Sequence, residues 1–195
     1  MERVIQIFPS HRQADEADRQ ALSAMTPQER LDRAVALQAH YREVHGDIGQ
    51  GLHELLALFH ATGVDFLVVG GHAVAFHGRP RLTEDLDLFV RPDLENGRRI
   101  VQAVERFGFG SLDITPADFQ AGDRVIQLGR APNRVDLLTN LYGVDFAGAW
   151  SRRVPARLDD THVWIISRDD LIRNKRETGR TQDLADAEFL EQIEP

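Results

Sequence analysis

The chain has 195 residues, a length that favours one domain with additions over two complete domains. Its 31 acidic and 23 basic residues give a net charge of −8, which disfavours non-specific binding to DNA. The absence of cysteine excludes disulfides, thiolate zinc sites and a cysteine nucleophile. There is no apolar run of the ~20 residues that span a bilayer and no signal-peptide pattern, so we expect a cytoplasmic protein with no membrane partner.

The first quarter of the chain differs in character from the rest. Residues 1–25 are polar and aperiodic, so we interpret them as a flexible arm or a partner-dependent segment. Thr26 and Glu29 have the spacing of a capping box, which predicts that a helix begins there. We therefore interpret 1–49 as an N-terminal extension, made of an arm and a helix, and 50–195 as the main domain.

The main domain combines helices and strands. Apolar residues at helical spacing predict helices, and β-branched or alternating runs predict strands. In chain order we expect a helix at 50–61, a strand at 65–69, a short helix at 72–78, a strand at 82–90, a helix at 95–107, strands at 125–129 and 134–139, a helix at 145–152, a strand at 162–166, a helix at 168–178 and a last helix from Thr181. This order predicts an α/β (α+β) fold: a small mixed sheet of about four to six strands with helices mostly on one face, framed by the N-terminal helical extension and by C-terminal helices.

Three aspartates on predicted strands are the candidate metal ligands. Asp85 and Asp87 are two residues apart, so their side chains share one face of a strand. Ionised carboxylates this close repel each other unless a cation lies between them, and ligands that offer only oxygen suit Mg²⁺ or Mn²⁺ rather than zinc. Asp136 lies in a second predicted strand and would complete the cluster if the two strands pair.

Gly70 and Gly71 lie between the first strand and the short helix. A helix N-terminus presents free N–H groups and a partial positive charge, which suit a phosphate, and glycine permits its close approach. A triphosphate bound here would meet a metal ion held by the aspartates. Taken alone, each signal has a simpler interpretation: Asp-x-Asp as a solvated strand face, Asp136 as a surface or salt-bridged residue, and the glycines as a tight turn.

The combined pattern resembles the signature of the DNA polymerase beta-like nucleotidyltransferase superfamily. That signature is a hydrophobic residue followed by two glycines, 13 further residues, and then two aspartates that alternate with hydrophobic residues; here it is Val69, Gly70, Gly71, Asp85, Leu86, Asp87 and Leu88. The third carboxylate of the superfamily matches Asp136. The tail, LIRNKRETGRTQDLADAEFL, is similar to the closing motif of a bacterial subgroup that includes the nucleotidyltransferase toxins of type IV toxin–antitoxin pairs, although Gln182 stands where that subgroup has a basic residue.

The resemblance implies an NTP-dependent and metal-dependent nucleotidyltransferase. Asp85, Asp87 and Asp136 would be both catalytic and metal-binding, with Mg²⁺ or Mn²⁺ as cofactor. The nucleoside triphosphate would be bound by Gly70, Gly71, His72, Arg79 and Lys175, the last of which is the single lysine among 23 basic residues. The acceptor of the NMP group would be a hydroxyl of an RNA or tRNA 3′ end, of a small molecule such as an antibiotic, or of a protein side chain. The resemblance also implies a cognate antitoxin or a second copy of the chain as partner. A catalytically inactive nucleotide-binding or partner-binding module of the same fold is the alternative.

Each of the remaining candidates has both a functional and a structural interpretation. His72 and His77 contact either the nucleotide or the protein interior, and Lys175 binds phosphate or is solvated on its helix. Asp183 and Asp186 are interpreted as acids at a helix N-terminus, with contact to Lys175 or Arg180 as the minor alternative. Six arginines are candidates for an RNA-binding patch: Arg152, Arg153, Arg157, Arg173, Arg176 and Arg180.

Overall fold

The structure is a computed structural model that describes residues 23–45, 50–83, 85–109, 114–120, 122–129 and 134–193. The predicted arm at the N-terminus therefore lies almost entirely outside the described residues.

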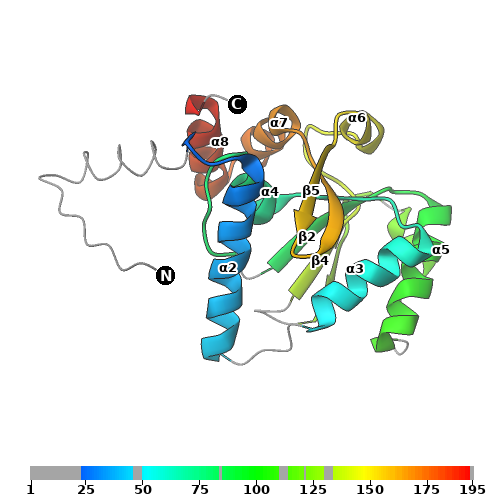
Figure 1. The fold of residues 1–195 in the computed structure, drawn as a ribbon. Coiled ribbons are helices and arrows are strands. Elements are labelled where there is room, and N and C mark those ends of the chain that lie inside the picture. The colour runs from blue at the N-terminus through cyan, green and yellow to red at the C-terminus, as the bar shows by residue number, and fades with distance from the viewer. Residues whose placement is uncertain are drawn as a thin grey trace, which may run out of the picture.

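Helices surround a single sheet (Figure 1). They are α2 (Pro27–His45), α3 (Gln50–Thr62), α4 (Gly70–His77), α5 (Leu94–Val104), α6 (Phe146–Ser151), α7 (Arg168–Thr178) and α8 (Thr181–Gln192), with a π-helical turn at Glu105–Phe109 and a 3-10 turn at Pro116–Phe119. Of the helices in the described ranges, none has the length and apolar character needed to cross a bilayer. Each predicted helix is present, with ends that differ by up to three residues from the expected ones.

The sheet has six strands in the order β3-β4-β2-β1-β6-β5. Their bounds are β1 (Phe66–Val68), β2 (Asp85–Val90), β3 (Val125–Leu128), β4 (Arg134–Leu138), β5 (Val154–Leu158) and β6 (Thr161–Ile165). The pairs β2/β4 and β1/β6 are parallel, and the other neighbours are antiparallel. The predicted α/β class with a small mixed sheet is confirmed.

Strand β5 was not predicted from the sequence. It forms a hairpin with β6 through a turn in which Asp159 has a φ of 48°. Pro155 lies inside the strand, and proline lacks the N–H that a central strand needs. Because β5 is an edge strand, its outer side needs no such donor, and the proline is tolerated.

The alternation along β2 separates the two faces of the sheet. Leu86 and Leu88 point into the core, on the face where Phe59 of α3 packs edge-on against Phe66 of β1 at a centroid distance of 5.8 Å. Phe89 points to the opposite face, where its ring lies 5.1 Å from that of Phe146 on α6. Asp85 and Asp87 belong to this second face, because strand side chains alternate. The two aspartates therefore lie on the face of the sheet opposite to the one on which α3 packs.

Helix α2 closes one edge of the sheet as well as packing on α4. The predicted capping box is present: Thr26 N–H donates to Glu29 at 2.7 Å, and Glu29 N–H donates to Thr26 Oγ1 at 3.2 Å. Within the first turn of this helix, the Gln28 amide donates to the Arg157 carbonyl at 2.9 Å and accepts from the Arg157 N–H at 3.0 Å. The Gln28 side chain thus satisfies both backbone groups of Arg157, as a neighbouring strand would. Leu31 is fully buried in the common core, so α2 packs as part of one body with the sheet.

Candidate metal and nucleotide site

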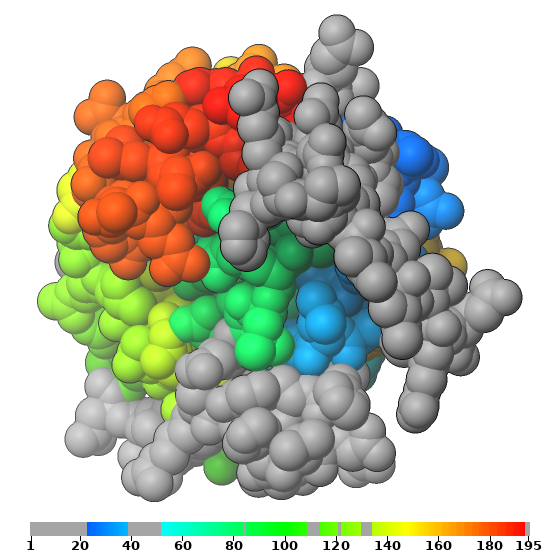
Figure 2. Space-filling model, turned by 90° about the vertical axis from the view of Figure 1, so that its left-hand side faces the viewer, coloured from blue at the N-terminus to red at the C-terminus, as the bar shows by residue number. Residues whose placement is uncertain are grey.

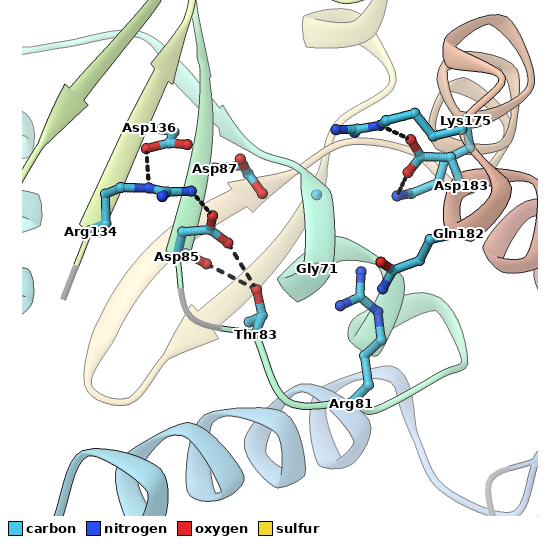
Figure 3. Close-up of a pocket in the computed structure, with 12 residues that line it drawn as sticks. Gly71, Arg81, Thr83, Asp85, Asp87, Arg134, Asp136, Lys175, Gln182 and Asp183 are labelled. Atoms are coloured by element: carbon cyan, nitrogen blue, oxygen red, sulfur yellow. Dashed lines mark hydrogen bonds and ion pairs between the residues drawn. The ribbon is translucent and has the colours of Figure 1, made fainter. Parts of the chain in front are cut away.

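Three carboxylates meet on adjacent parallel strands (Figure 3). Asp87 of β2 and Asp136 of β4 are direct partners across the two strands, and Asp85 precedes Asp87 by one pleat. Each of the three offers one oxygen that lies within 4.8 Å of the others. The strand pairing on which the predicted cluster depends is therefore present, and the donor set consists of carboxylate oxygens, which fits Mg²⁺ or Mn²⁺.

Burial and mutual repulsion change the ionisation of this cluster. Burial, followed by the charges of Asp85 and Asp136, raises the pKa of Asp87 to about 6, although Lys175 and Arg134 oppose the shift. Among the described residues, no side chain donates a hydrogen bond to the Asp87 carboxylate. A divalent cation would relieve both costs, because it adds positive charge beside the Asp87 carboxylate.

Arg134 is a site residue that was not predicted from the sequence. It is the strand partner of Asp85 and lies two residues before Asp136, so all three side chains share one face. Its guanidinium forms an ion pair with Asp85 and donates through Nε to Asp136 Oδ1 at 2.9 Å. Figure 3 shows the guanidinium bridging these two carboxylates. The sequence shows only that Arg134 lies two residues before Asp136, on the same face of its strand. Its pairing with Asp85 depends on the register between β2 and β4.

The two glycines bring the backbone of α4 against the carboxylates. Gly70 has a φ of 58°, and a Cβ atom added to it would lie 1.8 Å from Asp87 Oδ2. A Cβ atom added to Gly71 would lie 2.7 Å from the hydroxyl oxygen of Thr83. Because the first N–H groups of a helix have no intrahelical acceptor, this close approach sets hydrogen-bond donors beside the acidic cluster.

The opposite wall of the pocket contains a buried lysine. Lys175 of α7 is only 5% exposed, which excludes the interpretation as a solvated helix residue. Its ammonium forms ion pairs with Asp183 and Asp186 of α8, the second at 3.3 Å. Burial raises the pKa of Asp183, but hydrogen bonds from Lys175 and Arg180 outweigh it and hold the pKa below its usual range. Asp183 lies in the first turn of α8 as predicted, whereas Asp186 lies beyond it. Both also form ion pairs with basic side chains, which was the minor alternative.

Asp186 also forms ion pairs with two arginines of the loop before β2. It is fully buried, and it accepts from Arg79 at 3.2 Å and from Arg81 at 3.3 Å. Arg81 lines the pocket, whereas Arg79 is outside the lining and lies over the ring of Phe189 at 5.2 Å. One carboxylate therefore positions two cations that face the pocket, Lys175 and Arg81.

The two histidines are oriented into the protein. His72 is buried, with Nε2 3.1 Å from the Gln38 side-chain oxygen of α2, and it is outside the pocket lining. His77 Nε2 lies 2.7 Å from the Ile166 carbonyl. Burial is the main cause that lowers the pKa of His77 to about 4, so the ring is neutral at pH 7 and donates to that carbonyl. Both contacts are structural ones.

These elements enclose a pocket of about 480 Å³. In Figure 2, the orange and red C-terminal helices lie beside the green segment that leads into β2. Both parts contribute residues to the pocket, together with the start of α4 and strands β2 and β4. Its described lining consists of Gly70, Gly71, Arg81, Thr83, Asp85, Asp87, Arg134, Asp136, Lys175, Arg180, Gln182 and Asp183. Five predicted site residues other than Lys175 thus line one cavity with it, and His72 and Arg79 do not.

The arginines considered for an RNA patch have partners. Five of the six pair with carboxylates: Arg152 and Arg173 with Asp170, Arg157 with Asp160, Arg176 with Glu191 and Arg180 with Asp183. The sixth, Arg153, lies between the rings of Trp150 and Trp164 at 4.2 and 4.4 Å. Most of these arginines are therefore paired with an acid within the protein.

No protein-family model matches this sequence, and no curated protein matches it. Among solved structures, the fold is similar to that of the lincosamide antibiotic adenylyltransferase LnuA in a lincomycin-bound crystal structure. The similarity covers 75% of this chain and 98% of that chain, with 16% sequence identity and a TM-score of 0.44. A likeness of this extent leaves the function to be inferred from the chemistry of the pocket.

Proposed function

We propose that the protein is a metal-dependent nucleotidyltransferase that moves an NMP group from a nucleoside triphosphate to an acceptor hydroxyl. The observation that carries the proposal is the pairing of Asp87 with Asp136 across two parallel strands, with Asp85 on the same face. Three carboxylates within 4.8 Å of one another, beside a helix N-terminus and a buried lysine, combine ligands for a cation with donors for a phosphate chain.

The acidic cluster would hold Mg²⁺ or Mn²⁺. The bound cation would neutralise phosphoryl charge, which is the main contribution of metals to such transfers. Gly70 and Gly71 would present backbone N–H groups to the triphosphate, and Lys175 and Arg81 would approach it from the other wall. Because Asp186 fixes both cations, little rotamer freedom is lost when a phosphate binds.

The reaction forms one bond and breaks one. The acceptor oxygen attacks the α-phosphorus, the bond from that phosphorus to the oxygen that bridges to the β-phosphorus breaks, and pyrophosphate leaves. Asp136 is the carboxylate to which we assign the proton of the acceptor hydroxyl. Positioning and electrostatic stabilisation account for most of the rate enhancement in this scheme.

The distribution of charge bears on the class of acceptor. The arginines proposed for RNA binding are mostly paired with acids, and the chain carries a net charge of −8, so electrostatic attraction of a polyanion is weak. A small hydroxyl compound, including a cationic one of the aminoglycoside type, is therefore favoured over tRNA as acceptor. An inactive nucleotide-binding module is the competing proposal, and the complete carboxylate trio speaks against it.

Transfer of label from each α-³²P NTP tests the proposal. The protein is incubated with Mg²⁺ and one NTP at a time, with total tRNA in one series and hydroxylated small molecules in another. Label should pass to an acceptor with wild type and should be lost with Asp87→Ala. An Asp123→Ala variant, in the loop before β3 and outside the pocket, is the control and should transfer normally. Transfer that persists in Asp87→Ala would refute the metal mechanism, and Mg–NTP binding without transfer would support the inactive module.

A further inference from the structure

Arg134 forms hydrogen bonds with carboxylate oxygens that a metal ion would use as ligands. Its guanidinium engages Asp85 Oδ2 and, at 2.9 Å, Asp136 Oδ1. The other oxygens of these carboxylates also have donors: Thr83 Oγ1 donates to Asp85 Oδ1 at 3.2 Å, and Gln127 donates to Asp136 Oδ2 at 3.3 Å. Each oxygen of Asp85 and Asp136 therefore accepts a hydrogen bond within the protein itself.

The backbone keeps Arg134 close to this position. It is paired with Asp85 across β2 and β4 and has Asp136 on its own strand, so its Cβ cannot leave the face that carries the cluster. Its side chain is 31% exposed and lines the pocket, so it can move outward by rotation of its own torsions without a change in the core. If the Arg134 guanidinium left the carboxylates, a phosphate of a bound nucleotide would be the anion nearest to it.

From these contacts we propose that Arg134 is an internal counter-ion, a positioning residue that holds Asp85 and Asp136 until a nucleotide binds and then releases them to the metal ion. The inference rests on the proposed function, since it assumes the metal site and the triphosphate. A metal ion arriving alone must displace a charge-assisted bridge. When a triphosphate is present, its negative charge gives the displaced guanidinium a new partner. Metal binding and nucleotide binding are therefore positively coupled through this one side chain.

Mn²⁺ binding, measured from the EPR signal of the free ion, tests the proposal without any turnover. In the absence of nucleotide, Arg134→Gln should bind Mn²⁺ about tenfold more tightly than wild type, a change of ~1.4 kcal/mol. A non-hydrolysable NTP analogue should tighten Mn²⁺ binding strongly in wild type and much less in the variant. Arg134→Lys keeps a positive charge but loses the two-sided bridge, so its affinity should fall between the two.

Two controls separate the possible results. Arg124→Gln removes a surface arginine that pairs with Asp118 outside the pocket, and it should leave Mn²⁺ affinity unchanged. Asp87→Ala should abolish binding with and without nucleotide. If Arg134→Gln binds Mn²⁺ as wild type does or more weakly, while Asp87→Ala does not bind, Arg134 only organises the cluster and the inference is wrong. If wild type and all variants fail to bind Mn²⁺ even with nucleotide, the metal site of the proposed function is itself wrong.

A general structural defect cannot mimic the expected result. Misfolding lowers metal affinity, whereas the proposal predicts that loss of Arg134 raises it. Circular dichroism and thermal unfolding of each variant establish that the fold is retained. Removal of Arg134 should also lower the midpoint of thermal unfolding of the metal-free protein, since the carboxylates lose their counter-ion, and added Mn²⁺ should restore it.

Discussion

Gly70 and Asp87 approach each other so closely that a single methyl group on Gly70 would collide with the carboxylate, at 1.8 Å from Oδ2. The contact joins the start of α4 to the middle of β2, and the N–H of the preceding residue, Val69, donates to the Asp87 carbonyl at 3.0 Å. The helix N-terminus and the acidic cluster are thus one rigid unit.

Substitution of Gly70 by alanine should therefore abolish the site. The new Cβ displaces Asp87 and also forces a side chain into a φ of 58°. We expect Mn²⁺ affinity to fall at least about tenfold and stability to fall by more than the ~1 kcal/mol that the left-handed backbone costs a residue other than glycine. Gly63→Ala is the matched control, because Gly63 has a φ of 72° with nothing within 4 Å of the added atom. Equal effects of both changes on Mn²⁺ binding would contradict this account.

Asp87→Asn should stabilise the metal-free protein while it removes metal binding. The pKa of Asp87 is raised to about 6, so its ionised form costs folding free energy above that pH. Unfolded, the side chain ionises near 3.8, so the cost is absent at pH 4, grows between pH 4 and 6 and is constant above. At pH 7.5 we expect an unfolding midpoint higher by about 2–4 °C, equivalent to ~1 kcal/mol. The gain should vanish as the pH approaches 4 in thermal scans; a gain independent of pH would argue for a cause other than ionisation.

His77 should give the opposite dependence on pH. Mainly because of burial, the pKa of His77 is lowered to about 4, whereas the unfolded side chain takes up its proton near 6.5. Unfolding is therefore favoured progressively as the pH falls from 6.5 to 4. His77→Gln retains a donor for the Ile166 carbonyl but has no titrating ring. Urea unfolding at pH 7 and pH 5 should show a smaller loss of stability on acidification in the variant, and an unchanged loss would place the sensitivity elsewhere.

Arg79 and Arg81 form a matched pair for testing nucleotide binding. Both donate to the fully buried Asp186, but Arg81 lines the pocket and Arg79 does not. Arg81→Gln should raise the Kd for an Mg–NTP analogue about tenfold, because a direct charge-assisted contact is lost. Arg79→Gln should change it by no more than about twofold, because Arg79 does not line the pocket and Asp186 keeps its contacts with Arg81 and Lys175. Calorimetric titration measures both, and equal losses would mean that the arginines act only through Asp186.

The strand periodicity makes the acidic cluster predictable. Alternation along β2 alone sets Asp85 and Asp87 on one face, and the strand around Asp136 is recognisable in the same way. The role of Arg134 depends on parallel register, and a single sequence does not show which residue of one strand lies opposite which residue of another. The alternation of side chains determines which face each residue lies on, but it does not determine which residues of two strands are partners.

The C-terminal half of the pocket is predictable only in outline. Both helices and the cap at Ser167 follow from the sequence, and Ser167 accepts from the Asp170 N–H as an N-cap does. The ion pairs of Lys175 with Asp183 and Asp186 depend on how α7 and α8 pack against each other, which helix periodicity does not determine.

The position of His72 directly after the glycines favours a nucleotide contact, yet its ring packs towards α2 and not into the pocket.

The hydrogen bonds of Gln28 with Arg157 have a consequence for how copies of this protein meet. An open edge strand is a template on which another chain can add a strand, and such addition leads to fibrils or swapped dimers. A side-chain amide that uses both the N–H and the carbonyl of Arg157 removes one full repeat of that template, and Pro155 on the same strand contributes no N–H at all. By covering this part of the edge, α2 should therefore limit the addition of strands from other chains, an effect that does not depend on any chemistry in the pocket.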